Sequence, residues 1–332
     1  MRRERSDLRQ VMGMTAMKHA ILKYTAAAGL TAAAGLGAVT GGIYLYAFYS
    51  PRGKQNDDHH VLVPMDTPEM YERSIRMIDR MNERPFERVS VTSFDGLRLN
   101  GRYYRVRDGA PLAILCHGYR GTPSRDFCGG ADACISMGLN VLLIEERAHC
   151  TSEGHTTTFG VKERYDVLTW TQYAVRRFGP DVKILLGGIS MGGGTVLMAS
   201  ALDLPENVRG ILADCPFTSP AAIIRSFGEK AGLPMKLAYP MAALSARLWG
   251  GFSLTAADAA EAVKSAKVPI LLIHGEADGL VPCEMSRLIA EANPRLTERH
   301  TFPGADHGLS YMADTARYRK IVEDFCARIF AD

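Results

Sequence analysis

The fold of this 332-residue chain is decided by one stretch, Leu185-Leu186-Gly187-Gly188-Ile189-Ser190-Met191-Gly192-Gly193-Gly194. An apolar run leads into Gly188-x-Ser190-x-Gly192, and a helix-like segment follows from about Gly193. This is the context of a nucleophile elbow, in which the serine occupies a strained turn and its neighbours lack a Cβ. The N–H groups at the start of the helix would point at negative charge developing beside Ser190. The stretch therefore predicts Ser190 as a nucleophile; a tight packing turn is the alternative.

Short apolar runs bounded by glycine and proline lie on both sides of this stretch and alternate with helix-length segments. Such runs are typical of buried parallel strands, and the alternation predicts a doubly wound, mostly parallel α/β sheet. Upstream, alternating residues flank Phe94-Asp95-Gly96, which indicates an antiparallel hairpin at the sheet edge. The hairpin strands are expected at 87–93 and 97–105, and the later strands at 112–116, 141–144, 184–186, 210–213, 270–273 and 297–302.

A serine hydroxyl needs a base to accept its proton, and at a nucleophile elbow the acid and then the histidine follow the serine along the chain. His307 lies in an Asp-His-Gly loop after the last expected strand, where a general base would be exposed and mobile. His274, at a strand end, and His300, inside a strand, are weaker candidates. We therefore predict His307 as the general base, with an ordinary surface-loop histidine as the alternative.

The orienting acid is expected in the loop that follows the apolar run 270–273. Asp278 at the end of this loop can fix the imidazole tautomer and stabilise the imidazolium. Glu276 is the rival carboxylate, but it lies nearer the strand. Asp278 is therefore the predicted acid, and a cap on the helix that starts near Pro282 is its alternative role.

An oxyanion hole requires two preorganised N–H donors. One is expected from Met191, directly after the nucleophile, and the other from the loop 115–121 after an early strand. In that loop the backbone of Tyr119 is the natural donor, because glycines on either side allow a close approach. The Tyr119 side chain would line an acyl pocket or pack against a lid, and Arg120 is expected to be a solvated loop charge rather than a ligand for a substrate carboxylate.

Residues 217–262 interrupt the alternation of strands and helices. Two segments, 221–230 and 235–249, have helical patterns and are separated by Gly232-Leu233-Pro234. An insertion between two parallel strands would lie over the carboxyl ends of the sheet, where ligands bind in such folds. We predict a small helical lid.

Residues 25–50 form a long uncharged run with aromatic residues at its end. A helix of this length would cross a hydrocarbon core of ~30 Å, and its aromatic end suits an interface. The positive-inside rule then makes 1–24 a cytoplasmic tail and places the catalytic domain outside a cell membrane, although the scattered cysteines favour a reducing compartment. A cleaved signal peptide and a buried or amphipathic helix are the alternatives. The basic residues before the run are Arg2, Arg3, Arg5, Arg9, Lys18 and Lys23.

The boundaries that follow are a linker at 51–65, rich in polar residues, and a catalytic domain at 66–332 that begins with a helical pattern at 66–84. In the uncharged run, Ala33, Gly37 and Gly41 recur every four residues. Such small-residue spacing permits close helix packing and leaves a homodimer open.

Composition excludes several classes of protein. With 47% hydrophobic and 23% charged residues, the chain is neither disordered nor a polytopic membrane protein. A net charge of +3 without a long basic tract in the body of the chain indicates no nucleic-acid partner. The seven cysteines contain no CxxC pair, so no metal site is predicted, and the expected chemistry needs no cofactor.

With these residues in order, the chain resembles the α/β-hydrolase superfamily over residues 87–330. The resemblance rests on an HGxxG loop at 117–121, the GxSxGG elbow, a GxxDxxVP segment at 275–282 and the DHG loop. Residues 145–154 resemble the family's D-x-R-G-x-G-x-S-x-G loop, but Glu145, Ala148 and Cys150 depart from it. The run 147–154 and the Glu-Arg-Tyr-Asp at 163–166 are most similar to membrane-anchored bacterial hydrolases of the serine-aminopeptidase-like and prolyl-oligopeptidase-like branches.

The resemblance implies an α/β-hydrolase fold and a serine hydrolase of the carboxylesterase type (EC 3.1) that acts on a small-molecule ester or acyl substrate. A peptidase, an amidase or an acyltransferase would use the same three residues. A membrane-tethered binding protein on this fold is the non-catalytic alternative, but such proteins typically lack one of the three. The substrate itself stays undefined.

Overall fold

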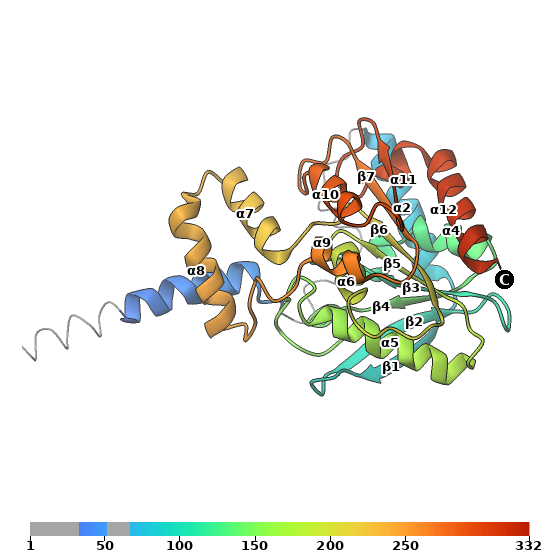
Figure 1. Ribbon diagram of the computed structural model, residues 1–332, viewed down its shortest axis with the longest axis horizontal. Coiled ribbons are helices and arrows are strands. Elements are labelled where there is room, and N and C mark those ends of the chain that lie inside the picture. The colour runs from blue at the N-terminus through green and yellow to red at the C-terminus, as the bar shows by residue number, and fades with distance from the viewer. Residues whose placement is uncertain (1–32, 52–66, 332) are drawn as a thin grey trace, which may run out of the picture.

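The computed structural model describes residues 33–51 and 67–331 (Figure 1). Its centre is an eight-stranded sheet with the strand order β1-β2-β4-β3-β5-β6-β7-β8. β2 pairs antiparallel with β1 and with β4, and the remaining pairs are parallel, so the predicted hairpin forms one edge of a mostly parallel sheet. The strands are β1 (Glu87–Thr92), β2 (Arg98–Tyr104), β3 (Leu112–Cys116), β4 (Asn140–Ile144), β5 (Ile184–Ile189), β6 (Val208–Asp214), β7 (Ile270–Gly275) and β8 (Thr297–Phe302).

The central strands have continuous apolar sequences because helices cover both faces of the sheet. Successive side chains of a strand point to opposite faces. In β3, Leu112, Ile114 and Cys116 belong to the core on one face, whereas Ala113 and Leu115 belong to the core on the other. Both faces of the sheet are therefore shielded from water by packed side chains, as the sequence pattern predicts.

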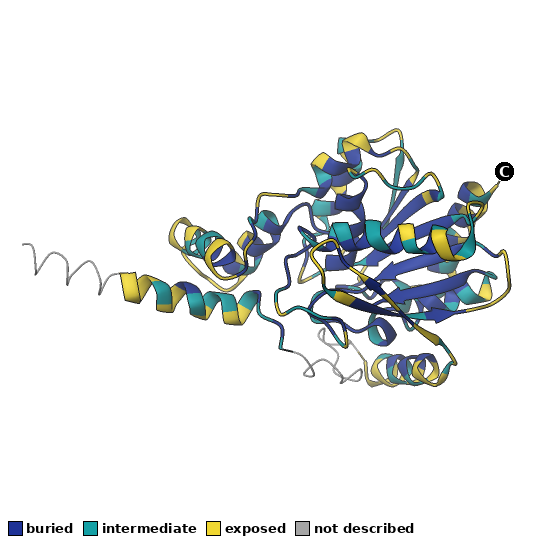
Figure 2. Ribbon diagram, turned by 90° about the horizontal axis from the view of Figure 1, so that it is seen from below, coloured by how far each residue is buried: buried dark blue, intermediate teal, exposed yellow. Residues whose placement is uncertain are grey.

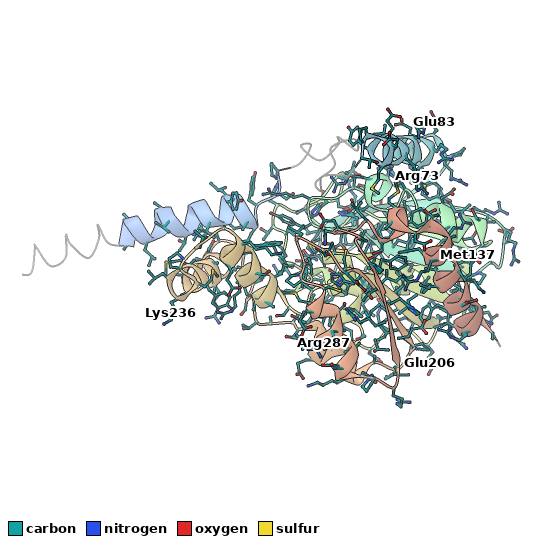
Figure 3. All side chains as sticks on the ribbon, turned by 90° about the horizontal axis from the view of Figure 1, so that it is seen from above. Arg73, Glu83, Met137, Glu206, Lys236 and Arg287 are labelled. Atoms are coloured by element: carbon teal, nitrogen blue, oxygen red, sulfur yellow. The ribbon has the colours of Figure 1, made fainter. Side chains whose placement is uncertain are left out.

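α5, α6 and α10 contribute to the core on one face of the sheet, and α2, α4 and α12 to the core on the other. Arg73 and Glu83 on α2 and Arg287 on α10 mark opposite sides of the molecule (Figure 3). The longer helices are α2 (Pro68–Glu83), α5 (Glu163–Phe178), α6 (Met191–Ala199), α7 (Pro220–Lys230), α8 (Met235–Leu248), α10 (Glu284–Ala292) and α12 (Thr315–Phe330). The short ones are α3 (Pro123–Asp126), α4 (Gly130–Ser136), α9 (Ala259–Ala262), η1 (Val263–Ser265) and α11 (Ser310–Ala313).

α7 and α8 fall within the segment 217–262, where the sequence predicts a helical lid. Ser219 caps α7 by accepting the N–H of Ala222, and Pro220 occupies the first turn. The two helices pack on each other and project from the sheet (Figure 1). They extend beyond the edge at which β5, β6 and β7 end.

Residues 33–47 are helical, and we call them the N-terminal helix. This helix lies beside α8 (Figure 1), where the Ser245 hydroxyl donates to the Thr40 carbonyl over 2.7 Å. Gly41, in the small-residue pattern, faces the ring of Trp249 rather than open space. We call the N-terminal helix, α7 and α8 together the helical arm.

Beyond the N-terminal helix the chain enters the core of the hydrolase-like body. The Phe48 side chain is fully buried and packs edge-on against Phe159 and Phe252. Tyr49 forms an isolated antiparallel bridge with Thr156. The end of the uncharged run therefore belongs structurally to the catalytic domain.

Among the helices of the described residues, none combines the length and the apolarity that crossing a membrane requires. The predicted tail 1–24, the first part of the predicted anchor at 25–50 and nearly all of the linker 51–65 lie outside the described residues. The single-pass anchor and the side of the membrane stay predictions.

Candidate active site

Ser190 lies between β5 and α6 in the strained turn that the sequence predicts. Its φ of 55° is in the left-handed region, which a non-glycine residue rarely adopts. The turn needs glycine on both sides: a Cβ on Gly188 would lie 2.2 Å from the Gly192 carbonyl oxygen, and one on Gly192 would lie 1.9 Å from the Cys116 carbonyl oxygen. The Ser190 N–H donates to the Asp214 carbonyl over 2.8 Å, which ties the turn to β6.

The structure brings the three predicted residues into one hydrogen-bonded chain. His307 Nε2 lies 2.8 Å from Ser190 Oγ, and His307 Nδ1 lies 2.7 Å from Asp278 Oδ2. The loop of His307 is less exposed than its sequence suggests, because the side chain is 9% accessible. Nδ1 faces a carboxylate and therefore carries a proton, which leaves Nε2 free to accept the serine proton.

Asp278 performs both of the roles that the sequence left open. Its Oδ2 binds His307, while its Oδ1 accepts the N–H groups of Leu280 and Val281 and fixes the loop before α10. Burial would raise the pKa of Asp278, but hydrogen bonds from His274 and His307 hold that pKa well below its usual range. Its rival Glu276 is exposed and accepts a hydrogen bond from Thr301 instead.

His274 is a second histidine on the same carboxylate, which sequence reasoning did not place there. Its Nε2 lies 3.1 Å from Asp278 Oδ2 and 3.1 Å from the Val281 carbonyl. Both partners are acceptors, so Nε2 carries the proton. The available signal was its position four residues before Asp278, at the end of β7.

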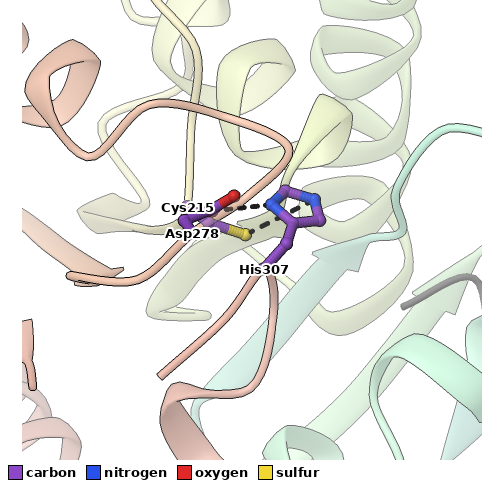
Figure 4. A group of neighbouring side chains, drawn as sticks. All are labelled: Cys215, Asp278 and His307. Atoms are coloured by element: carbon purple, nitrogen blue, oxygen red, sulfur yellow. Dashed lines mark hydrogen bonds and ion pairs between the residues drawn. The ribbon is translucent and has the colours of Figure 1, made fainter. Parts of the chain in front are cut away.

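Cys215 is the other unpredicted neighbour of the site (Figure 4). It directly follows β6 with a φ of 43°, and its Sγ lies 4.0 Å from His307 Nε2. Burial, with Asp214 and Asp278 nearby, raises the pKa of its thiol well above the ordinary value. Sγ, a His307 nitrogen and an Asp278 oxygen lie within 4.8 Å of one another. The thiol is neutral and the carboxylate is already bonded to two imidazoles, so both groups are poor metal ligands.

The predicted oxyanion loop after β3 is held by partners outside it. The Gly118 N–H donates to Asp126 Oδ2 over 2.8 Å, and the Arg120 N–H donates to His149 Nε2 over 3.0 Å. Burial opposes ionisation of Asp126, but the charge of Arg125 and the hydrogen bonds from Arg125 and the Gly118 N–H keep its pKa below the ordinary value. These bonds fix the backbone on both sides of Tyr119, whose N–H is one of the two predicted donors.

Arg120 is not simply a solvated loop charge. Its guanidinium donates to the Tyr46 carbonyl over 2.6 Å and lies over the ring of Tyr119, 5.0 Å from the centroid. The Tyr119 hydroxyl in turn donates to the Ala47 carbonyl over 3.0 Å. The Tyr119 ring also stacks on Phe159 and lines the cavity described below. Both residues connect the N-terminal helix to the site.

A cavity of about 200 Å³ opens beside Ser190, and Tyr119, Met191 and His307 also line it. Most of its wall is apolar, with contributions from α7 and from the loops after β6 and β7. Its acidic lining residues in the described chain are Asp126 and Asp214. Its larger apolar lining residues include Phe159, Phe217, Ile223, Phe227 and Leu280.

The loop 145–154, which departs from the family pattern at three positions, has an unusual backbone conformation at two of them. Ala148 and Cys150 stand where the pattern has glycine, and both adopt positive φ values, 62° and 47°. Arg147 at the centre of the loop binds Asp166 through two hydrogen bonds of 2.7 Å, and also binds Asp95. This ionic network holds a glycine-type conformation without glycine.

Comparison with protein families finds matches over two adjacent parts of the chain. Residues 111–231 match the family model described as the alpha/beta hydrolase fold. Residues 237–312 match the model described as serine aminopeptidase, S33. The first range contains the predicted nucleophile and the second contains the predicted acid and base.

Among individual proteins, YqkD of Bacillus subtilis is 23% identical over 253 residues, which cover 72% of this chain and 80% of YqkD. The thiohydrolase aneE of Aspergillus aculeatus is 26% identical over 140 residues, covering 40% of this chain and 42% of aneE. Esterase Pf2001 of Pyrococcus furiosus superposes with a TM-score of 0.60 at 22% identity, over 81% of this chain and 96% of the esterase. Est1E of Butyrivibrio proteoclasticus with bound ferulic acid superposes with a TM-score of 0.57 at 20% identity, over 74% of this chain and 100% of Est1E.

Proposed function

Because this chain belongs to the α/β-hydrolase superfamily and is a hydrolase, we propose that it cleaves carboxylic esters through an acyl-enzyme on Ser190. The observation that carries this proposal is the 2.8 Å approach of His307 Nε2 to Ser190 Oγ at the wall of an apolar cavity. An esterase of this type uses only groups of its own chain and needs no cofactor or metal.

In the proposed reaction His307 Nε2 accepts the hydroxyl proton while Ser190 Oγ bonds to the ester carbonyl carbon. The carbonyl electrons move to oxygen, and the N–H groups of Tyr119 and Met191 stabilise this oxyanion. When the intermediate collapses, His307 donates the proton to the departing alkoxide. Water, deprotonated by His307, then attacks the acyl carbon and releases the acid and free Ser190.

Asp278 stabilises the imidazolium that forms twice in this cycle. Its depressed pKa keeps it ionised throughout the neutral range, so the positive ring always faces a negative carboxylate. His274 donates to the same oxygen from the other side and limits rotation of the carboxylate. We assign His274 as a positioning residue, since it contacts no reacting atom.

The aminopeptidase description of the second family match makes a peptidase the main competing function. An aminopeptidase has to bind a substrate ammonium group, usually with an ionised carboxylate. The acidic groups that line the described cavity do not suit this role. Asp126 is committed to the Gly118 N–H and Arg125, while burial raises the pKa of Asp214 to about 7. The apolar wall favours an acyl or alcohol group instead.

The test is hydrolysis of p-nitrophenyl esters of increasing acyl length by the full chain in detergent. Ser190→Ala should lower kcat by about 10⁵-fold or more, as the loss of a triad nucleophile does elsewhere. Ser200→Ala is the matched control, because Ser200 lies at the other end of the same helix and donates to the Leu197 carbonyl. It should retain activity and react with a fluorophosphonate.

Two outcomes would contradict the esterase. If Ser190→Ala kept full ester hydrolysis, Ser190 would not be the nucleophile. If the wild type cleaved aminoacyl p-nitroanilides faster than all the esters, the competing peptidase would replace it. A wild-type protein that is inert to every ester and to the fluorophosphonate would indicate a binding protein on this fold.

A further inference from the structure

We propose that the outer faces of the N-terminal helix and α8 together form a surface that docks onto a bilayer with anionic headgroups. We call this the docking surface. It is independent of ester hydrolysis, because it involves none of the residues assigned to the reaction. The argument rests on which side chains the arm exposes and which charges surround them.

The N-terminal helix has two faces, and both are uncharged. Its inner face packs on α8 through Thr40 and Gly41. Its outer face exposes Val39, Leu45 and Tyr46, which are 55%, 60% and 80% accessible. A helix that is apolar on all sides is typically buried, yet here many of its residues are exposed (Figure 2).

α8 continues the exposed apolar area. Leu237 is 70% accessible, Leu248 is 61% accessible, and Trp249 at the end of the helix is 51% accessible. Leu237 and Leu248 lie eleven positions apart, which is three helical turns and places them on one face. Large exposed apolar side chains therefore occur on both of the helices that pack on each other, and soluble monomers rarely expose large apolar patches.

The charges around this area select the occupant. α8 carries exposed Lys236 and Arg247 and no acidic residue, and the N-terminal helix carries no charge at all. Lys236 lies at the outer end of the arm, away from the sheet (Figure 3). Apolar side chains flanked by cations are the signature of a helix that rests on an anionic lipid surface.

The chain before the described residues supports a lipid occupant over a protein. No charged residue occurs from Tyr24 to Pro51, and the six basic residues that precede Tyr24 outnumber the two acidic ones, Glu4 and Asp7. A basic cluster next to an apolar segment is attracted to anionic headgroups. A segment of this composition would bring the arm to an anionic bilayer.

The docking surface is connected to the active site through α7. This helix packs on α8, and its Ile223 and Phe227 line the cavity beside Ser190. Tyr119 links the N-terminal helix to the same cavity through its hydroxyl bond to Ala47. A bilayer against the arm would therefore lie one helix layer away from the cavity.

The chain contains two tryptophans, so tryptophan fluorescence can report on the docking surface alone. Trp249 is half exposed within the docking surface, whereas Trp170 is fully buried on the inner face of α5 and serves as an internal reference. The full-length protein is mixed with phosphatidylcholine vesicles, with or without phosphatidylglycerol, that contain brominated acyl chains. Bromine quenches a tryptophan only at close range. We expect quenching with the anionic vesicles and none in Trp249→Phe.

Three variants test the surface itself. The double variant Leu237→Glu with Leu248→Glu should lose the quenching, while Leu288→Glu, at an exposed leucine of α10, should retain it. Lys236→Gln with Arg247→Gln leaves the apolar area intact and should weaken binding to anionic vesicles about 30-fold, at roughly 1 kcal/mol for each cation. Thermal unfolding of each variant establishes that it is folded.

Protein that floats with vesicles while Trp249 stays unquenched would overturn the proposal, since the chain would then be held by another segment. Equal quenching in the double glutamate variant would also overturn it, as would the absence of binding to either vesicle. If the glutamate variants failed to fold, the cation variants would decide alone. If the variant with Lys236→Gln and Arg247→Gln combined bound anionic vesicles with wild-type affinity, the docking surface would be refuted.

Discussion

The region at the carboxyl ends of the strands around Ser190, which we call the edge, and the helical arm are held together in different ways. At the edge, buried polar side chains are joined by hydrogen bonds, and Asp278 alone binds two imidazoles and two backbone N–H groups. In the arm, the polar contacts between helices come mainly from Thr40, and large apolar side chains face outward. The edge can hold atoms in reacting positions, whereas the arm can adapt to a deformable partner. Substitutions in the two regions should therefore differ in kind and in size.

After loss of the Ser190 nucleophile itself, the largest effect is expected at Asp278, the acid of the edge. Asp278→Asn keeps the shape but cannot stabilise the imidazolium or fix the required tautomer, and should lower kcat by about 10⁴-fold. The measurement is steady-state hydrolysis of a p-nitrophenyl ester. Glu276→Gln, in the same loop after β7, is the control and should stay close to wild type. A larger loss in Glu276→Gln would transfer the role of the acid to Glu276.

Glycine substitutions should separate the regions by stability. In Gly192→Ala the new Cβ would lie 1.9 Å from the Cys116 carbonyl oxygen, and only a shift of the backbone could relieve this clash. We therefore expect the free energy of unfolding to fall by more than about 3 kcal/mol, or the variant not to fold. Gly42→Ala, in the N-terminal helix, meets nothing within 4 Å and should gain up to about 1 kcal/mol. Urea unfolding measures both. Equal stability of the two variants would contradict the close packing of the elbow.

Buried carboxylates at the edge should make stability depend on pH. Burial raises the pKa of Asp214 to about 7, from 3.8. At a pH above 3.8, the Asp214 carboxyl loses its proton more readily in the unfolded chain than in the folded one. The Asp214 side chain therefore increasingly opposes folding as the pH rises from about 4 to 7. Asp214→Asn removes this effect. Its stability relative to wild type should therefore be higher at pH 8 than at pH 4.5 in urea unfolding; a constant difference would contradict the shift.

The smallest effect is expected in the arm. Thr40→Val removes the acceptor of the Trp249 Nε1–H, but this group is partly exposed and water can replace the threonine. The loss should be about 1 kcal/mol or less. Thr169→Val on α5 is the control, because its hydroxyl likewise bonds the carbonyl four residues back but has no partner from another helix. A loss of several kcal/mol, beyond that of the control, would make the arm as rigid as the edge.

The sequence predicts the edge well because its constraints are local. Gly188 and Gly192 are required by the turn itself, and Asp278 and His307 each end a recognisable strand-loop segment. His274 and Cys215 were missed for the opposite reason. Their proximity to His307 or Asp278 arises only when parallel strands distant in sequence are placed side by side.

The arm illustrates a different limit of sequence reasoning. The pattern at 221–230 and 235–249 predicts α7 and α8 nearly to the residue, because helix periodicity is local as well. The contact of Ser245 with Thr40 joins segments about two hundred residues apart, and no local signal reports it. Uncharged sequence such as 25–50 satisfies a bilayer and a protein surface equally, so apolarity alone could not reveal that its last residues pack on the catalytic domain.

Phe48 has a practical consequence for anyone who shortens this chain to obtain a soluble enzyme. A cut after the uncharged run, for example before Arg52, looks natural from hydropathy. It would remove a fully buried ring from between Phe159 and Phe252 and open a hole in the domain core next to the catalytic cavity. Loss of a buried phenylalanine side chain typically costs about 3–5 kcal/mol, a large share of the stability of an ordinary domain. Fragments meant for crystallisation or screening should therefore retain Phe48, and low yield from shorter ones would reflect the missing ring.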